Sequence, residues 1–343
     1  MGGLAFLPVI LISLCVITGI RYYMNEPVAP VWSSCLFIRY LFLVAGTTML
    51  YLVGVADDLV GVGYRYKFVV QILSASFLPL SGLWINDLGG LLGLHAIPAF
   101  IGMPLTVFLV VYITNAINLI DGIDGLASGL TCIALGLLII VCAFVGQWTH
   151  ALLASATLGV VATFYYYNVF SISGRKLFMG DAGSLTLGYI LSFLILHFWM
   201  QQEYWNPFRL NLNMVTISTL FIPLLDVIRV FYSRVRSGRN PFLPDKNHIH
   251  HKLLRTGMRI RTVMITLLLL SLFLVAANFV LSFYINATFM LLFDLIFWCT
   301  SHLVINRAIV KHEKLTGRKW YKTYIHVPVS YTHLRAHETP EHL

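Results

Sequence analysis

Ten stretches of this sequence are long and apolar enough to cross a lipid bilayer, and they limit what the chain can fold into. A membrane-spanning helix needs about 17–25 predominantly apolar residues. The stretches lie near residues 4–20, 35–56, 67–85, 99–119, 126–145, 150–168, 183–199, 213–232, 262–285 and 287–305. We therefore predict an all-α, polytopic membrane helix bundle that occupies residues 1–306.

The composition supports the same class. Of the 343 residues, 58% are hydrophobic and 11% are charged, against about 25% charged residues in soluble domains. This excludes a soluble enzyme, a disordered chain and a secreted disulfide scaffold. In a soluble protein the net charge of +9 would suggest nucleic acid; in a membrane protein it bears on topology instead, and we expect no nucleic-acid partner.

Basic residues fall almost entirely on one side of the predicted bundle. Of the 23 Lys and Arg residues, Arg21, Arg39 and Arg209 lie on or toward one side and the other 20 on or beside the other. An excess of Lys and Arg marks the cytoplasmic side. The connections 57–66, 120–125, 169–182 and 233–261 and the tail from 306 are therefore predicted to be cytoplasmic.

Five aspartates gather at helix ends on that cytoplasmic side, in three separate connections: Asp57, Asp58, Asp121, Asp124 and Asp181. A carboxylate at the centre of the bilayer costs about 2.5–3.5 kcal/mol, so their placement is informative. Ordinary interfacial charge is the alternative. The pattern favours a site for a divalent cation and phosphate groups.

Asp57 and Asp58 close the first motif, which begins at Gly54 and is followed by Arg65 and Lys67. Adjacent carboxylates repel, so one of them has a raised pKa unless a cation lies beside them. A role in metal binding or proton transfer follows. The alternative is a helix cap for the next span, for which one aspartate is enough.

The second motif ends the fourth span. Asn115 and Asn118 are three residues apart, hence on one face of a helix. Two Asp-Gly pairs, at residues 121–122 and 124–125, then predict a tight reversal whose glycines let backbone N–H groups approach a phosphate. A single Asp-Gly turn would be ordinary turn chemistry.

The third motif runs from Phe178 to Ser184 and places Asp181 at the start of a span. A helix N-terminus suits an anion, although Asp181 is also explained as a simple helix cap. Asn168, at the end of the preceding span, is expected to face the same loop, where it could read a base or sugar edge.

The fourth motif is a basic loop at residues 237–251 that contains Arg239, His248, His250 and His251. No second ligand cluster or nearby cysteine supports a zinc site. The histidines are better interpreted as hydrogen-bond donors to phosphate, with contact to anionic lipid heads as the alternative. Nearby in the sequence, Asp226 lies three residues before Arg229, which predicts a structural ion pair.

Together these motifs resemble those of the polyprenyl-phosphate N-acetylhexosamine-1-phosphate transferases, in order and on the same face, over nearly the whole chain to about residue 306. The loop PFLPDKNHIHHKLLRTG resembles the WecA/TagO branch, which initiates O-antigen, enterobacterial common antigen or teichoic acid chains. The resemblance implies a bacterial inner-membrane enzyme with eleven spans and a cytoplasmic active site.

The resemblance also implies roles for individual residues. Asp181 is similar to the family's magnesium-ligating aspartate, and Asp121 matches the metal and nucleotide-sugar region and is also a catalytic position. The remaining matches are catalytic positions (Asp57, Asp58, Asp124, His248, His250 and His251) and substrate-binding positions (Asn115, Asn118, Asn168 and Phe178, with the basic residues Arg65, Lys67 and Arg239).

The implied reaction transfers N-acetylglucosamine 1-phosphate from a UDP-sugar to undecaprenyl phosphate and releases UMP. Mg²⁺ would offset the repulsion between the two anionic substrates, with Mn²⁺ as an alternative ion. Direct attack by the lipid phosphate and a covalent aspartyl intermediate both stay open. The donor could also be another UDP-N-acetylhexosamine or UDP-MurNAc-pentapeptide. Binding of other membrane lipid and assembly into a homo-oligomer stay open as well. An ion-coupled transporter is the alternative of a different class.

Both termini depart from the family pattern. The first residues resemble the start of the family's second span, so we expect one helix to be missing. Residues 307–329 are expected to form a basic cytoplasmic tail, and residues 330–343 look like sequence of non-native origin.

Overall fold

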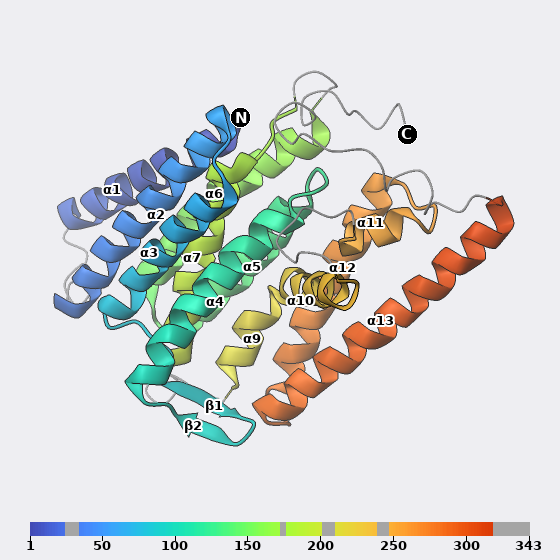
Figure 1. The fold of residues 1–343 in the computed structure, drawn as a ribbon. Helices are drawn as coiled ribbons and strands as arrows, with labels where there is room; N and C mark the ends of the chain where they lie inside the picture. The colour runs from blue at the N-terminus through green and yellow to red at the C-terminus, as the bar shows by residue number, and fades with distance from the viewer. Residues whose placement is uncertain (25–33, 172–175, 201–209, 239–246, 318–343) are drawn as a thin grey trace.

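The computed structural model describes residues 1–24, 34–171, 176–200, 210–238 and 247–317, and these fold into a bundle of long helices (Figure 1). The first half consists of the short turn η1 (Gly3–Ala5) and the helices α1 (Phe6–Tyr23), α2 (Ser34–Val60), α3 (Tyr64–Leu80), α4 (Ala99–Ile120), α5 (Leu126–Phe144) and α6 (Trp148–Phe170). The second half consists of α7 (Gly180–Met200), α9 (Leu212–Ser218), α10 (Phe221–Arg236), α11 (Ile249–Leu254), α12 (Ile260–Leu281) and α13 (Ala287–Thr316).

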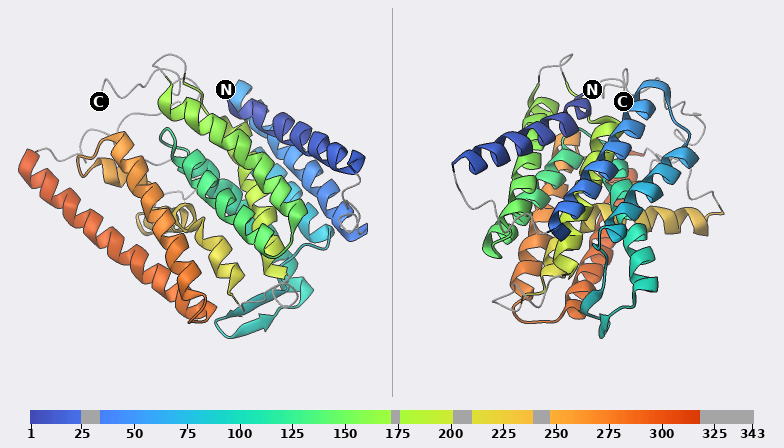
Figure 2. Two further views of the ribbon diagram at one scale, coloured as in Figure 1. Left: turned by 180° about the vertical axis from the view of Figure 1, so that it is seen from behind. Right: turned by 90° about the vertical axis from the view of Figure 1, so that its left-hand side faces the viewer.

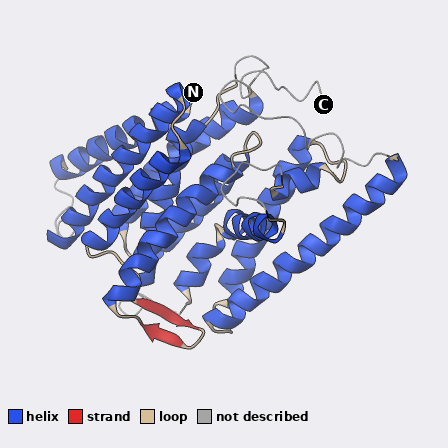
Figure 3. Cartoon of the chain, viewed as in Figure 1, coloured by secondary structure: helices blue, strands red, loops and turns tan. Residues whose placement is uncertain are grey.

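The predicted membrane helices are confirmed. In the described part, eight helices are long and apolar enough to span a bilayer, and α9 with α10 makes a ninth candidate if the bent pair is one span. The remaining predicted stretch, 67–85, coincides with α3, which has 17 residues. The only strands described, β1 (Asp87–Leu91) and β2 (Leu94–Ala96), form an antiparallel hairpin within a predicted connection (Figure 3).

The eighth predicted span is not one straight helix. It divides into α9 and α10, whose axes differ by 71°. Pro223 explains where the chain bends: in a continuous helix its ring would clash with the carbonyl of Thr219, four residues earlier, whereas the first turn of a new helix tolerates it. In Figure 2, α10 runs across the direction of its neighbours. The predicted span over 213–232 thus corresponds to a bent pair of helices.

Helix α7 forms the centre of the bundle, and all of its residues from Gly180 to Trp199 are buried. It packs most extensively against α2 and α4. Two glycines make these approaches close: a Cβ on Gly54 of α2 would lie 2.5 Å from the Cα of Ala182, and one on Gly188 would lie 2.6 Å from the Cα of Thr114. Small residues at such contacts let helix backbones approach each other within a membrane.

The packing on α7 brings several sequence motifs to one end of the bundle. Only two residues separate the hairpin from α4, so the C-terminal end of α4, with Asn118 and the 121–125 turn, lies at the opposite end of the bundle from the hairpin. The C-terminal end of α2 and the N-terminal end of α7 meet it there. Helix α13 continues to Thr316, so the first ten residues of the expected tail are helical; Gly317 follows as the C-cap, and the rest of the tail, from residue 318, lies outside the described residues.

Candidate active site

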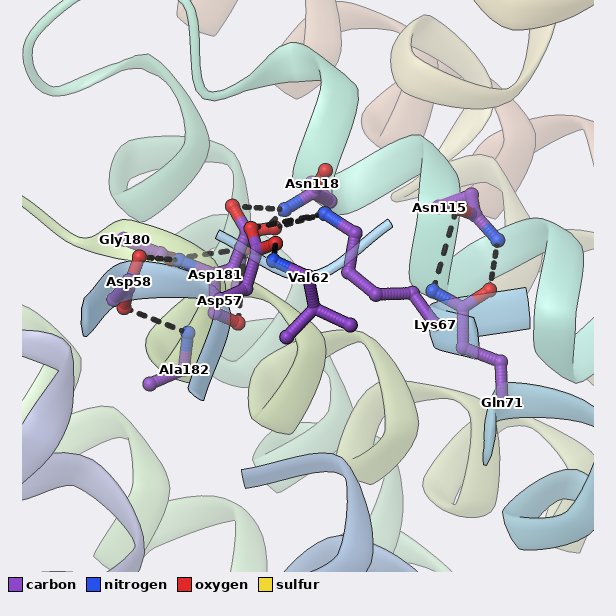
Figure 4. Close-up of polar contacts among 11 residues, drawn as sticks. Asp57, Asp58, Val62, Lys67, Gln71, Asn115, Asn118, Gly180, Asp181 and Ala182 are labelled. Carbon is purple, nitrogen blue, oxygen red and sulfur yellow. Dashed lines mark hydrogen bonds and ion pairs between the residues drawn. The ribbon is translucent and has the colours of Figure 1, made fainter. Parts of the chain in front are cut away.

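One lysine joins two aspartates from different helices at this end of the bundle. Lys67 of α3 donates to Asp57 Oδ2 of α2 at 3.0 Å and to Asp181 Oδ2 of α7 at 2.7 Å (Figure 4). The lysine and Asp57 are about one fifth exposed, and Asp181 is buried. Bringing two carboxylates together costs energy unless a cation lies between them, and here the ammonium supplies that charge.

Asn118 completes this network from α4. Its amide donates to Asp181 Oδ1 at 3.1 Å and to Ser184 Oγ at 2.8 Å. The carboxylate of Asp181 is thus held from both sides. The alternative that Asp181 serves only as a helix cap is not supported, because the side chain that caps α7 is a different one.

Asp58 caps α7 from the neighbouring helix. Its Oδ1 accepts the N–H of Asp181 at 2.9 Å, and its Oδ2 accepts the N–H of Ala182 at 3.2 Å. Gly180 makes room for this carboxylate: its φ is +69°, and a Cβ there would lie 2.4 Å from Asp58 Oδ2. The first N–H groups of α7 are therefore occupied by Asp58, so the expected anion site at this helix N-terminus is filled by the protein's own carboxylate.

The two asparagines of the second motif have different partners. Asn115 donates to Gln71 Oε1 of α3 at 2.7 Å and to the carbonyl of Val111 at 2.8 Å, and Gln71 donates back to it at 3.4 Å. Asn115 therefore joins α3 to α4, while Asn118 faces α7. Sequence reasoning did not single out Gln71, although its amide within the apolar 67–85 stretch was a usable signal.

Asn168 ties three segments together. Its Oδ1 accepts the N–H of Gly125 at 2.5 Å, and its Nδ2 donates to the carbonyl of Leu177 at 2.7 Å and to Asp124 Oδ1 at 3.4 Å. Lys176 pairs with the other oxygen of Asp124 at 2.8 Å. The sequence predicts that Asn168 offers its amide to a base or sugar; in the structure its side chain is buried and holds the Asp-Gly turn in place.

The glycines of that turn serve two purposes. Gly125 has φ of +79°, as expected for a tight reversal. Gly122 does not have a positive φ; it leaves space for a histidine, because a Cβ there would lie 2.4 Å from His250 Nε2. The histidine motif thus reaches the Asp-Gly turn, although more than a hundred residues separate them in the sequence.

The three histidines form a compact cluster at the start of α11. The ring of His250 is stacked on that of His248, with centroids 5.8 Å apart, and lies 4.3 Å from that of His251. Burial, with the neighbouring histidines, lowers the pKa of His250 well below its usual value, so this ring is neutral at neutral pH. Both of its buried ring nitrogens lack a hydrogen-bond partner among the described residues.

Other predicted site residues lie at the edge of these clusters. Arg65 interacts with the ring and hydroxyl of Tyr64 at the surface, and Phe178 is 49% exposed. Asp121 is the C-cap of α4, three residues after Asn118. Arg239 lies outside the described residues.

Of the five aspartates, Asp57 and Asp181 come together as a pair through Lys67, and they do not form part of a larger ligand cluster in the described residues. Within the described ranges, no three His, Cys, Asp or Glu side chains form a group that could hold a metal ion. Asp57 and Asp181 still offer hard carboxylate oxygens, which Mg²⁺ prefers, and their bridging ammonium marks a position where positive charge is favourable.

Comparison with known proteins places these motifs in a family. Residues 40–198 match the model of glycosyl transferase family 4. This segment contains all three residues of the Asp57–Lys67–Asp181 network. The undecaprenyl-phosphate alpha-N-acetylglucosaminyl 1-phosphate transferase of Yersinia pestis is 33% identical over 224 residues, which cover 64% of this chain and 60% of the relative.

Two further relatives agree. The protein of the same name from Escherichia coli strain K12 is 31% identical over 73% of this chain and 70% of its own length. A probable undecaprenyl-phosphate N-acetylglucosaminyl 1-phosphate transferase of Bacillus subtilis is 30% identical over 68% of this chain and 63% of its own length. The alignments thus span 60–70% of these relatives. The motifs of this chain and its bundle of membrane helices agree with these similarities. The chain therefore belongs to glycosyl transferase family 4, together with the bacterial undecaprenyl-phosphate N-acetylglucosaminyl 1-phosphate transferases.

Proposed function

We propose that this protein transfers N-acetylglucosamine 1-phosphate from UDP-N-acetylglucosamine to undecaprenyl phosphate, releasing UMP and leaving a lipid-linked pyrophosphate sugar. Such a product would initiate a cell-envelope polysaccharide. The observation that carries the proposal is the Asp57–Lys67–Asp181 network, in which charged groups from three helices meet at one end of a membrane bundle. The names of its relatives supply the substrate class.

Two anionic substrates have to approach each other in this reaction, so positive charge is the main requirement. Asp57 and Asp181 would hold Mg²⁺, and Asp121, three residues after Asn118, is a further candidate ligand. When bound, the ion would neutralise charge on the pyrophosphate. Lys67 of this chain supplies a cation beside the same two carboxylates, and Asn118 fixes the orientation of Asp181. The donor set fits a hard, oxygen-binding ion.

The chemical step would be a displacement at phosphorus. An oxygen of the lipid phosphate attacks the β-phosphorus of the UDP-sugar, and the bond from that phosphorus to the bridging oxygen breaks, so its electron pair leaves with UMP. A phosphate monoester has a second pKa near 6 and is mostly dianionic at neutral pH, so it needs no strong general base. The protein's task is then positioning.

A covalent aspartyl intermediate is less favoured. Both oxygens of Asp58 accept backbone N–H groups of α7. Those of Asp57 accept the N–H of Val62 at 2.7 Å and the ammonium of Lys67. Each of these four oxygens accepts a hydrogen bond, which stabilises its charge and lowers its nucleophilicity; this favours direct attack by the lipid phosphate.

The proposed location is the bacterial inner membrane, with this site on the cytoplasmic side. The network lies at the bundle end that receives the predicted cytoplasmic connections, which carry most of the 23 Lys and Arg residues. That orientation would expose the site to cytoplasmic nucleotide sugars.

A direct assay tests the function. Purified protein would be incubated with undecaprenyl phosphate, Mg²⁺ and one UDP-sugar at a time, and UMP release would be measured. We expect release with UDP-N-acetylglucosamine, dependent on both the lipid and the metal. Preference for another UDP-N-acetylhexosamine or for UDP-MurNAc-pentapeptide would change the substrate but keep the chemistry. If no donor yields UMP, the proposal is wrong, and an ion-coupled transporter becomes the favoured alternative.

A further inference from the structure

A buried ion pair on α10 holds the start of the histidine motif. Asp226 and Arg229 pair at 2.8 Å, as their spacing predicts, but the carboxylate of Asp226 has two more partners. Its Oδ2 lies 2.8 Å from His248 Nδ1, and its Oδ1 accepts the N–H of Ile249 at 3.0 Å. Arg229 also donates to the carbonyl of Asn247. The pair thus contacts three consecutive residues, from Asn247 to Ile249.

The contact to Nδ1 decides how the imidazole of His248 is presented. An ionised carboxylate can only accept a hydrogen bond, so Nδ1 has to carry the proton in this contact. The other ring nitrogen, Nε2, is then the one left to meet a substrate. The Ile249 contact fixes the backbone next to the ring, so both the tautomer and the direction of the imidazole are set by Asp226.

The same arrangement extends to the Asp-Gly turn. The ring of His250 is stacked on that of His248 with an interplanar angle of 3°, and it fits against Gly122. A change in the orientation of His248 would therefore alter the packing of His250 on the turn that follows Asn118. Asp226 is completely buried, whereas an ordinary surface ion pair would be exposed.

We propose that Asp226, supported by Arg229, is a positioning residue that fixes the tautomer and orientation of His248 for the phosphoryl transfer. Asp226 acts through His248 and does not touch the substrate itself. The inference rests on the proposed function for its consequence, since it assumes that His248 contacts a phosphate-bearing substrate. It departs from the sequence-based interpretation of Asp226 and Arg229 as a purely structural pair.

A double-mutant cycle separates positioning from simple stabilisation. Asp226→Asn, His248→Ala and the double variant would be compared by steady-state UMP release from the best donor. We expect Asp226→Asn alone to lower kcat/KM about 10–100-fold, the usual cost of losing the partner that orients a functional histidine. In the His248→Ala background the same change should cost less than about threefold, because the group it positions is already gone. Asp226→Glu, which keeps the carboxylate, should restore part of the activity.

Asp294→Asn is the matched control. Asp294 is another buried carboxylate with an amide donor, Asn278 Nδ2 at 2.8 Å, but it lies in α13 and outside the clusters described above. Its kcat/KM should stay within about twofold of the wild type if burial alone is not the cause. If Asp226→Asn instead reduces activity equally with and without His248, its role is structural and the positioning proposal is wrong.

A spectroscopic measurement needs neither a folded variant of Asp226 nor activity. Nitrogen NMR of ¹⁵N-histidine-labelled wild-type protein reports which ring nitrogen carries the proton, and the His248 signal is identified by its loss in His248→Gln. We expect the Nδ1–H form when the ring is neutral. The Nε2–H form would overturn the inference. If the wild type releases no UMP from any donor, the proposed function fails, while this measurement still tests the contact.

Discussion

Lys67 Nζ lies 2.7 Å from Asp181 Oδ2, although 114 residues separate the two in the sequence. The same ammonium lies 3.0 Å from Asp57, so one flexible cation satisfies two carboxylates from different helices. Such a lysine can turn toward a phosphate when another cation takes its place between the acids, because its charge is carried on a long rotatable side chain. This relationship leads to a test of metal binding that does not depend on turnover.

Lys67→Gln should make the protein more dependent on Mg²⁺ for its stability. Without the ammonium, Asp57 and Asp181 repel each other, so Tm in the presence of a chelator should fall. Added Mg²⁺ should then raise Tm more in the variant than in the wild type, since an ion that binds only the folded state stabilises it. The measurement is thermal unfolding in detergent across a Mg²⁺ titration. Lys311→Gln, at an exposed position of α13, is the control, and equal Mg²⁺ responses in all three proteins would contradict metal binding by this pair.

Asp181→Asn should remove activity while leaving the fold intact. The amide oxygen of Asn can keep the contact to Lys67, while its NH2 group replaces the oxygen that accepts from Asn118. One hydrogen bond is lost, so Tm should fall only slightly, but a hard anionic ligand is removed. UMP release should fall by about 10²–10³-fold or more, the scale expected when a charge-stabilising group is removed from a phosphoryl-transfer site. Asp294→Asn serves again as the matched buried control. Near-wild-type turnover at saturating Mg²⁺ would end the assignment of Asp181 as a metal ligand.

Gly54→Ala should disturb the site from a distance. Its new Cβ would lie 2.5 Å from the backbone of Ala182, so α2 and α7 have to separate. Overpacking of this kind costs about 1–3 kcal/mol, and it should also move Asp57 and Asp58 away from the start of α7. Both Tm and UMP release should fall. Gly136→Ala in α5 has open space around the new Cβ and should be neutral or slightly stabilising in the same assays.

The membrane orientation can be tested with reporter fusions. Fusions after Asn86 and Gly146 should report the outside, and those after Arg175 and Asn240 should report the cytoplasm. The basic asymmetry of the connections is the reason. A cytoplasmic signal from Asn86 together with an outside signal from Arg175 would invert the bundle and place the candidate site away from nucleotide sugars.

Much of this protein could be predicted from the sequence, because the signals involved are local. Length and apolarity are properties of each stretch by itself, so all ten predicted stretches coincide with helices or with the bent pair. The clustering of aspartates at one end followed from counting alternate connections. The i, i+3 pair of Asp226 and Arg229 was also predictable, since both residues lie on one helix.

Tertiary structure decided which partner each polar side chain meets. Asp57 and Asp58 are adjacent in the sequence, yet one pairs with Lys67 and the other caps α7, because neighbouring residues on a helix point in different directions. Asn115 and Asn118 lie on one face of α4, yet Asn115 meets Gln71 of α3 and Asn118 meets Asp181 of α7, because two different helices pack against α4. Hydropathy averages over a window, so it could not show the 71° bend before α10.

The sequence by itself therefore determined the class of the fold, the number of apolar stretches and the end of the bundle at which the chemistry gathers. Those features depend on composition and on spacing along one chain segment. Only the tertiary structure decided that Lys67 bridges Asp57 and Asp181 and that Asp226 holds His248. Contacts of this kind depend on the distance and the angle at which separate helices pack. Glycines such as Gly54 and Gly188 allow the close distance, but the local sequence does not show which helix will pack against them.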